Sequence, residues 1–463
     1  MLQSRIHGTV VGAGSASYDA ARRLYSPRFD ALHPLAVVYC ESAGDVAQTV
    51  RWAKANNVRI AVRSGGHSYG GYSTREGAVV IDVSRIAIVR VDDAHGTARV
   101  GAGARLIDVY GRLAQHGVTI PAGSCPSVGI GGLTLGGGFG LASRKFRLTC
   151  DSVRAVTVVT AAGAALHCDA HTYPGLFWAC RGGGGGSFGV VTAFTFATHP
   201  VGDVVTFRAA WNWSDAARVL AAWQAWAPHA PDELFSLVDL IATGSGTTLI
   251  GGAGQYFGTE SQLDSLLQQF FAAGAPPTSL EVTKRSYLDA MLFWANCSDL
   301  SRCHLGDEVG RSTFLAKSDF FNSPLPAAGV AAILHAVEAR AAAQASGSLL
   351  FDAWGGAVAR VSKAATAFVH RDALFSCQYI GSWDSPSAAG AEDAARSWLR
   401  NTYAVVRPYA SGFAYQNYID PELTSSLSAY YGENLPRLRR IKRIHDPKNV
   451  FRFAQSIPPA PPA

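Results

Sequence analysis

A chain of 463 residues is too long for a single ordinary hydrophobic core, so its length predicts two or three packed units. Hydrophobic residues make up 48% of the chain and charged residues 16%, which excludes an intrinsically disordered protein, and 8 cysteines in so long a chain exclude a small disulfide scaffold. The net charge of +6 includes no long arm of Lys and Arg, so we expect no nucleic-acid partner.

The first part of the chain alternates between helix and strand signals. Ser42 and Asp45 form a capping pattern before an amphipathic helix, and residues 59–62 predict a short buried strand. β-branched residues dominate residues 79–91, and a second amphipathic helix is expected over residues 106–113. Further strands are expected over residues 153–160 and 189–196. This alternation predicts a mixed α/β domain with glycine-rich loops between its elements.

The composition changes after residue 201. Segments rich in Ala and Leu over residues 215–226 and 325–343 predict helices, and stretches of strand character lie between them. We therefore expect a second domain to start near this point.

A basic segment lies near the C-terminus, at residues 437–448. Leu438, Ile441 and Ile444 recur in it at every third position, which predicts a helix with these three side chains buried. No apolar stretch is long enough to span a membrane, and the start of the chain shows no export signal. We expect a soluble protein without a membrane partner, either cytoplasmic or secreted with a signal that is not visible. The compartment and the oligomeric state stay open.

Three segments are dense in glycine: residues 63–71, 123–140 and 181–189. Each offers many unhindered backbone N–H groups at a turn, which is how a protein holds an anionic diphosphate without a dedicated lysine. None of them fits the Walker pattern of a nucleoside triphosphatase. The segments therefore predict a large phosphorylated cofactor.

Two reactive side chains lie inside these segments. His67 is flanked by residues too small to bury it, so we expect its imidazole to face whatever the loop holds. Cys125 lies between Ser124 and Pro126, near backbone N–H groups that would give its sulfur thiolate character. The alternatives are a satisfied loop histidine and an inert thiol.

Cys297, Cys303 and His304 lie close together in the chain. Two interpretations stay open for them, a small disulfide loop or part of a metal site. No other grouping of residues predicts a metal.

Several ordered motifs belong to these segments and to the end of the chain. They are VRSGGHSYGGYS, PAGSCPSVGIGG, LFWACRGGGGGSFGVVTAF, YQNYID and YYGENLPRLRRIKRIHDPKNVF. Together they closely resemble the berberine bridge enzyme-like and oligosaccharide oxidase branch of the vanillyl-alcohol oxidase type flavoproteins, from Tyr18 to Ser456. The resemblance implies a two-domain α+β fold: an FAD-binding domain over residues 1–200, a substrate domain with a helix-covered antiparallel sheet over residues 201–410, and a segment over residues 411–463 that returns to the FAD-binding domain.

The resemblance also implies a bicovalent FAD, joined through His67 to the flavin 8α-methyl and through Cys125 to C6. It places a further set of residues at the cofactor: Arg63, Ser64, Gly65, Gly66, Ser68, Val128, Gly129, Gly132, Gly138, Gly189, Val190 and Asn417. Val128 matches a position where the family's oxidases carry a small side chain that leaves dioxygen access to the flavin. Leu133 stands where the family often has a histidine.

For the general base, the oligosaccharide oxidases imply a tyrosine supported by an acidic residue, and these roles fall on Tyr415 and Asp352. Tyr418 is the competing tyrosine. If residues 415–418 form a strand, Tyr415 and Asn417 share one face and Tyr418 points elsewhere, which favours Tyr415. The alternatives are that Tyr415 is a core aromatic residue and that Asp352 caps a turn before Gly355.

The implied function is an oxidase that takes two electrons from a hydroxyl-bearing carbon of a sugar, an oligosaccharide or a secondary metabolite and passes them to dioxygen, giving hydrogen peroxide. A flavin dehydrogenase or oxidative cyclase acting on an alkaloid or polyketide is the alternative. A carbohydrate-binding module without catalysis is the more distant one.

Overall fold

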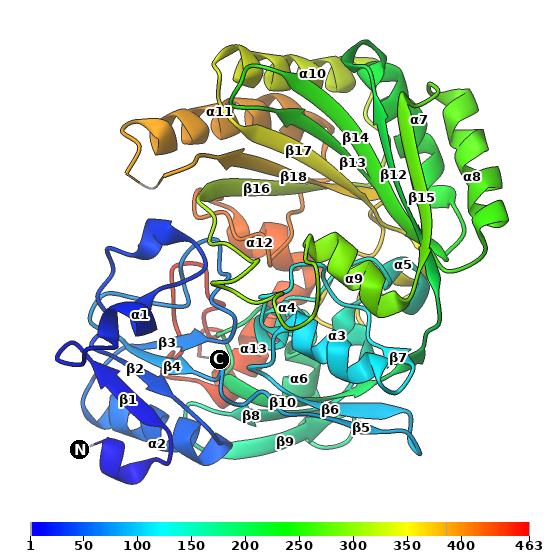
Figure 1. Ribbon diagram of the computed structural model, residues 1–463. Coiled ribbons are helices and arrows are strands. Elements are labelled where there is room, and N and C mark those ends of the chain that lie inside the picture. The colour runs from blue at the N-terminus through cyan, green and yellow to red at the C-terminus, as the bar shows by residue number, and fades with distance from the viewer. Residues whose placement is uncertain (1, 386, 463) are drawn as a thin grey trace.

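Two bodies, each with its own sheets, lie one above the other in the computed structural model, which describes residues 2–385 and 387–462 (Figure 1). The lower body contains a four-stranded sheet of order β1-β2-β4-β3 and a five-stranded sheet of order β5-β6-β10-β8-β9. The upper body contains a seven-stranded antiparallel sheet of order β15-β12-β14-β13-β17-β18-β16. This α+β arrangement agrees with the expected fold.

The strands and helices of the lower body come mostly from the first 200 residues. Its strands are β1 (Thr9–Gly12), β2 (Ala36–Tyr39), β3 (Ile60–Arg63), β4 (Val79–Asp82), β5 (Val89–Asp92), β6 (Thr97–Gly101), β7 (Val118–Thr119), β8 (Val153–Val159), β9 (Ala165–Asp169), β10 (Val190–Ala197) and β11 (His199–Pro200). Its helices are α1 (Tyr18–Arg22), α2 (Ala43–Ala55), α3 (Leu106–Ala114), α4 (Ile130–Leu135), α5 (Ser143–Phe146) and α6 (Pro174–Ala179). The predicted cap is present, because the Ser42 hydroxyl accepts a hydrogen bond from the Asp45 backbone N–H at 3.1 Å.

The upper body is formed by residues after β11. Its strands are β12 (Val204–Trp211), β13 (Leu234–Ala242), β14 (Thr248–Tyr256), β15 (Ser279–Arg285), β16 (Phe314–Phe321), β17 (Gly347–Ala353) and β18 (Phe375–Ser382). Its helices are α7 (Ala216–Trp226), α8 (Glu260–Ala273), α10 (Ala327–Ala342) and α11 (Ala391–Val406). Helix α9 (Tyr287–Ala295) follows β15 but packs beside α3 and adds its buried residues to the lower body's core. The predicted helices over residues 215–226 and 325–343 are α7 and α10. Helices α10 and α11 cover the upper face of the sheet, so its other face looks toward the lower body (Figure 1).

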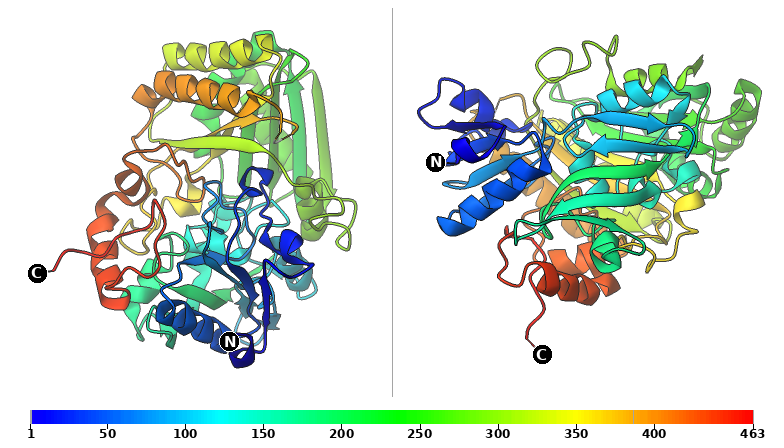
Figure 2. Two further views of the ribbon diagram at one scale, coloured as in Figure 1. Left: turned by 90° about the vertical axis from the view of Figure 1, so that its left-hand side faces the viewer. Right: turned by 90° about the horizontal axis from the view of Figure 1, so that it is seen from below.

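The C-terminal segment packs against the lower body (Figure 2). Helices α12 (Ser426–Tyr431) and α13 (Leu435–His445) add Tyr430 and Leu438 to the lower body's hydrophobic core. The domain boundaries at residues 200 and 410 stay a prediction.

The expected burial pattern of α13 is wrong at one position. Leu438 and Ile441 are buried, but Ile444 is 72% exposed. A helix repeats every 3.6 residues, so a spacing of three drifts off the buried face by the third position. Lys442 takes the buried place and donates hydrogen bonds to the Ser187 carbonyl at 2.6 Å, to the Phe451 carbonyl and to the Asp446 carboxylate.

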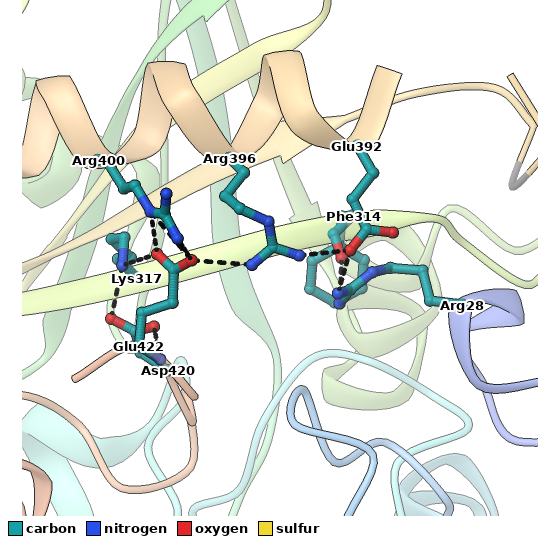
Figure 3. A network of polar contacts seen from close by, with 8 residues as sticks. All are labelled: Arg28, Phe314, Lys317, Glu392, Arg396, Arg400, Asp420 and Glu422. Atoms are coloured by element: carbon teal, nitrogen blue, oxygen red, sulfur yellow. Dashed lines mark hydrogen bonds and ion pairs between the residues drawn. The ribbon is translucent and has the colours of Figure 1, made fainter. Parts of the chain in front are cut away.

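An ionic network fastens the C-terminal segment to the upper body (Figure 3). Lys317 of β16 binds the carboxylates of Asp420 at 2.9 Å and Glu422 at 3.0 Å, and Glu422 also accepts from Arg396 and Arg400 of α11. Burial opposes the ionisation of Glu422, but the hydrogen bonds from these cations lower its pKa to about 2. The network therefore holds the stretch directly after YQNYID against the sheet.

The two open interpretations of Cys297 and Cys303 are decided in favour of the disulfide, which the structure contains. Within residues 2–385 and 387–462, no group of three or more His, Cys, Asp or Glu side chains could hold a metal ion. In the same part of the chain no helix has the length and apolar character needed to cross a membrane.

Candidate functional site

Two glycine loops of the lower body touch each other. One loop connects the parallel strands β3 and β4, and the other precedes α4. A Cβ atom on Gly65 would clash with the backbone of Gly129, and one on Gly129 would clash with Ser64 and with Gly65 itself. Only glycine permits this approach of two backbones. It brings the loop of His67 beside the loop of Cys125.

His67 is held between its own loop and the second one. Its Nε2 atom lies 3.0 Å from the Ser127 hydroxyl oxygen, and its ring stacks on Tyr25 at a centroid distance of 4.0 Å. Burial, together with the nearby charge of Arg105, lowers the pKa of His67 to about 3. The imidazole is therefore neutral, and its Nδ1 atom stays available for a ligand.

Cys125 differs from expectation in its electrostatics. Its side chain is exposed, yet desolvation by the surrounding protein raises the pKa of its thiol above the ordinary value. The predicted thiolate character is wrong for the protein without a ligand, because no cation offsets the loss of hydration.

The predicted cofactor residues divide into those that leave room and those that support the loops. A Cβ on Gly132 would meet nothing within 4 Å, so this position borders open space. Gly138 and Gly189 have φ angles of +77° and +147°, which favour glycine, and added side chains would strike Thr149 and Val159. Gly66 also has a positive φ of +73°. These glycines fix the course of the loops.

The polar side chains predicted for the cofactor are engaged within the protein. Ser64 donates to the Ala102 carbonyl at 2.7 Å, and the Ser68 hydroxyl accepts from the backbone N–H of Tyr72. The Arg63 guanidinium forms a buried ion pair with Asp82. We expected Arg63 to help to hold a diphosphate, but its charge is already neutralised.

Val128 and Val190 border the loops in different ways. The Val128 backbone N–H donates to the Cys125 carbonyl at 3.3 Å, so Val128 lies at the turn that carries the thiol, and it is half-buried. Val190 opens β10 and is fully buried, paired with Val159 of β8. Of the two, Val128 has surface open to the site.

Residues 415–418 form a turn, so the prediction that they form a strand is wrong. The Tyr418 backbone N–H donates to the Tyr415 carbonyl at 2.9 Å. The rings of Tyr415 and Tyr418 meet edge to face at a centroid distance of 4.9 Å. Both tyrosines therefore lie at the same place, whereas alternation along a strand would have separated them.

Tyr415 is 3% exposed and packs in an aromatic cluster with Trp354 and Phe368. Its phenol oxygen accepts hydrogen bonds from the Gly138 backbone N–H at 3.1 Å and from Asn417 Nδ2 at 3.0 Å. Burial raises the pKa of Tyr415, and these hydrogen bonds oppose the rise. Asn417 also donates to the Leu133 carbonyl, so this pair joins the C-terminal segment to the second glycine loop.

Tyr418 is half-buried and closer to the other candidate groups. Burial raises its pKa well above the usual value, and the charges of Asp352 and of a Cys125 thiolate would raise it further. Asp352 is not among the main influences on the pKa of Tyr415. Tyr418 is thus near both the predicted acidic residue and the thiol.

Asp352 lies on β17, on the sheet face that looks toward the lower body. Leu349 and Phe351 of β17 pack under the helices, so Asp352 and its alternate neighbours point the other way. Burial, together with the nearby Asp239, raises the pKa of Asp352 to about 7. Asp352 is thus not the exposed turn cap that was the alternative.

Asp239 of β13 was not predicted. Asp352 pairs with Leu237 in the strand register, and Asp239 pairs with Leu350, so the two carboxyl groups are diagonal neighbours on one face. Burial raises the pKa of Asp239 to about 6, and its Oδ1 atom has no hydrogen-bond partner among the described residues. Neither carboxyl group forms an ion pair with a described cation, so both keep their protons to a higher pH than ordinary carboxyl groups do.

Tyr69 and Gln378 were also missed. The Tyr69 ring stacks on Tyr418 at 5.6 Å between centroids, and its phenol oxygen accepts from Gln378 Nε2 at 2.9 Å. The position of Tyr69, two residues after His67, was the only signal in the sequence. Gln378 lies on β18, and only the strand register reveals that it shares the face of Asp352.

Comparison with known proteins decides the family. Residues 34–169 match the family described as FAD binding domain, and residues 414–458 match the one described as Berberine and berberine like. Berberine bridge enzyme-like D-1 of Nicotiana tabacum is 31% identical, over 92% of this chain and 83% of that protein. The chain belongs to the berberine bridge enzyme-like family of FAD-linked oxidoreductases.

Further relatives and solved structures match over nearly the whole chain. Bacillus subtilis YgaK, named an uncharacterized FAD-linked oxidoreductase, is 35% identical over 99% of this chain and 98% of its own. The structure of Physcomitrella patens BBE-like 1 has a TM-score of 0.90 and 35% identity, with 99% and 98% of the two chains covered. A chitooligosaccharide oxidase structure has a TM-score of 0.89 and 26% identity, with 99% of both chains covered.

The site fits the FAD of this family. The open space at Gly132, the available Nδ1 atom of His67 and the accessible thiol of Cys125 lie on touching loops. Gly132 and the half-buried Val128 leave the side of the second loop uncovered. These residues can hold a flat aromatic group between the two loops.

The raised pKa of Cys125 leads to a prediction for flavin-free protein. Among the described free cysteines Cys125 alone is exposed, so iodoacetamide should modify this one thiol in the folded chain. Because the thiolate is the nucleophile, we expect the rate at pH 8 to lie below that of free cysteine and to increase with pH. Peptide mass analysis over time measures the rate. Modification faster than free cysteine at pH 8 would contradict the assigned environment.

Proposed function

We propose that this FAD-linked oxidoreductase is an oxidase whose flavin is bound covalently to His67 and Cys125. It oxidises a hydroxyl-bearing carbon of a sugar, an oligosaccharide or a related secondary metabolite and passes the electrons to dioxygen, which gives hydrogen peroxide. The observation that supports this best is that the neutral His67 imidazole lies 3.0 Å from Ser127 of the Cys125 loop, while Tyr418 is near enough to Cys125 and Asp352 for both to influence its pKa. FAD supplies the two-electron acceptor in such a reaction.

Tyr418 is the base that the geometry supports best, with Asp352 as its partner. Tyr418 is half-buried, and it is close enough to Asp352 for that charge to raise its pKa. Its phenol oxygen would take the proton of the substrate hydroxyl while its own proton passes to the Asp352 carboxylate. Such a relay avoids a free tyrosinate, whose formation the burial of this ring opposes. Tyr415 and Asn417 would then hold the second glycine loop against the C-terminal segment.

A hydroxyl-rich substrate is supported by the polar face of the upper sheet. Asp239, Asp352 and Gln378 provide hydrogen-bond acceptors and a donor, and Tyr69 and Tyr418 provide aromatic surface beside them. Structures of a chitooligosaccharide oxidase and of a xylooligosaccharide oxidase from Myceliophthora thermophila are among the similar folds. The small side chain of Val128 next to Cys125 supports dioxygen as the acceptor.

A peroxide screen tests this proposal. Purified protein is mixed in air with mono- and oligosaccharides, aromatic alcohols and polyketide glycosides, and hydrogen peroxide is measured with a coupled peroxidase. We expect peroxide in a 1:1 ratio to the oxidised substrate. Substrate-reduced flavin that persists in air for minutes would instead identify a dehydrogenase, and a colourless protein would remove catalysis by FAD.

Replacement of each tyrosine by phenylalanine distinguishes the roles of Tyr415 and Tyr418. Tyr418→Phe should lower the rate of anaerobic flavin reduction by roughly 10²- to 10⁴-fold, since that is the typical contribution of a general base. Tyr415→Phe should lower it less, because its oxygen accepts two structural hydrogen bonds. Stopped-flow absorbance of the flavin measures both rates. A larger loss in Tyr415→Phe than in Tyr418→Phe would return the role to Tyr415.

The carboxyl pair predicts a pH dependence. Asp352 accepts a proton only when ionised, so the rate of flavin reduction should increase as the pH passes its pKa of about 7. Asp239→Asn removes the neighbouring negative charge, which lowers the pKa of Asp352 and moves this increase in rate to lower pH. Asp352→Asn should abolish the increase. An increase at unchanged pH in Asp239→Asn would show that another group titrates.

A further inference from the structure

The Arg105 guanidinium lies next to both glycine loops. It immediately precedes α3, and its backbone forms an isolated antiparallel bridge with Gly129. Its Nη1 atom donates to the Ser127 carbonyl at 3.1 Å, and a Cβ on Gly65 would lie 2.8 Å from the same atom. The side chain therefore reaches from the start of α3 across to the loop that carries His67.

No described carboxylate forms an ion pair with Arg105. Among the carboxylates, Asp82 raises the pKa of Arg105 most, but Asp82 is already paired with Arg63. Burial, together with the like charge of Arg63, lowers the pKa of Arg105, and the charges of Asp82 and Asp108 only partly oppose this. Two guanidiniums thus share one close carboxylate at this edge of the sheet, which leaves an excess positive charge.

The unused donors of Arg105 face accessible space. The Ser127 carbonyl is the only hydrogen-bond acceptor that this side chain reaches among the described residues. The residue is only half-buried, and none of its nitrogen atoms is both buried and without a hydrogen-bond partner. A guanidinium that is partly desolvated, without a counter-ion and open on one side is arranged to receive an anionic ligand with several acceptor oxygens.

We propose that Arg105 binds the diphosphate of FAD. The diphosphate carries the negative charge of the cofactor, and its oxygens match the planar fork of a guanidinium. The N-terminus of α3, which starts at the next residue, adds a partial positive charge at the same place. Arg105 thereby takes the part that Arg63 cannot take while it is paired with Asp82. This inference rests on FAD binding and does not depend on the covalent attachment.

Flavins that differ only in their phosphates test the proposal. In the full chain carrying His67→Ala and Cys125→Ala, flavin can be removed, and binding of FAD and of riboflavin is then measured by fluorescence titration. Adding Arg105→Met should weaken FAD binding by roughly 10- to 100-fold, the usual contribution of hydrogen bonds to a charged group, and should leave riboflavin binding within about twofold. Arg105→Lys should recover part of the loss. The control is Arg112→Met, because Arg112 is an exposed arginine of α3 that donates to Gln115.

Two results would overturn the assignment. Equal weakening of FAD and riboflavin would place Arg105 at the flavin ring, and no weakening of either would leave it a support for the Ser127 loop. The chain with His67→Ala and Cys125→Ala could retain no flavin. In that case Arg105→Met is made in the otherwise unchanged protein, and the amount of covalent flavin per chain is measured after denaturation. Lower loading than in Arg112→Met then supports the proposal, and equal loading contradicts it. Failure of the covalent proposal is distinct, since denaturant would release flavin from the unchanged chain.

Discussion

The site depends on the contact between two glycine loops. Gly65 and Gly129 approach so closely that neither position tolerates a Cβ atom. This contact brings His67 of one loop beside Ser127 of the other. Cys125 lies two residues before that serine, so it is carried by the same loop. The bridge between Arg105 and Gly129 then fixes α3 at the same point. A side chain at either glycine would separate the two loops and with them His67 and Cys125.

The charges of the site differ from those of the rest of the molecule. Elsewhere several buried ions are paired, as Arg63 is with Asp82, Lys442 with Asp446 and Arg371 with Asp151, whereas the buried guanidinium of Arg144 donates to backbone carbonyls instead. Burial of unpaired ions is costly, so proteins normally pair or neutralise them. At the site the carboxyl pair on the upper sheet and the guanidinium between the loops have no such counter-ions within the described chain. Groups left in this condition are arranged for a ligand, and this distinguishes the site from the structural ion pairs around it.

The sequence predicted the local elements and the loops well. The capping pattern at Ser42, the helices α7 and α10 and the glycine segments all follow from short-range rules. The family motifs predicted His67 and Cys125 as the residues joined to FAD. Of this, the comparisons confirm the FAD-linked family. The errors arose where a three-dimensional neighbour decides the outcome. Ile444 is exposed because the helix period carries it off the face on which Lys442 is buried, and Arg63 is occupied because Asp82 lies on the adjacent parallel strand.

Other features needed the fold itself. The strand register makes Asp239 a neighbour of Asp352 although the two residues are 113 positions apart in the chain, and no motif encodes that register. The turn at residues 415–418 brings two tyrosines together where an extended chain would part them. Desolvation of the Cys125 thiol outweighs the nearby backbone N–H groups, a balance that depends on the surrounding walls.

The central claim is that one flavin is bonded to two loops that touch at glycine. The most direct measurement is peptide mass spectrometry of the denatured and proteolysed holoprotein. The account predicts that the peptide containing His67 and the peptide containing Cys125 are recovered joined through a single flavin. Recovery of both peptides without added mass, with all FAD released by the denaturant, would contradict it.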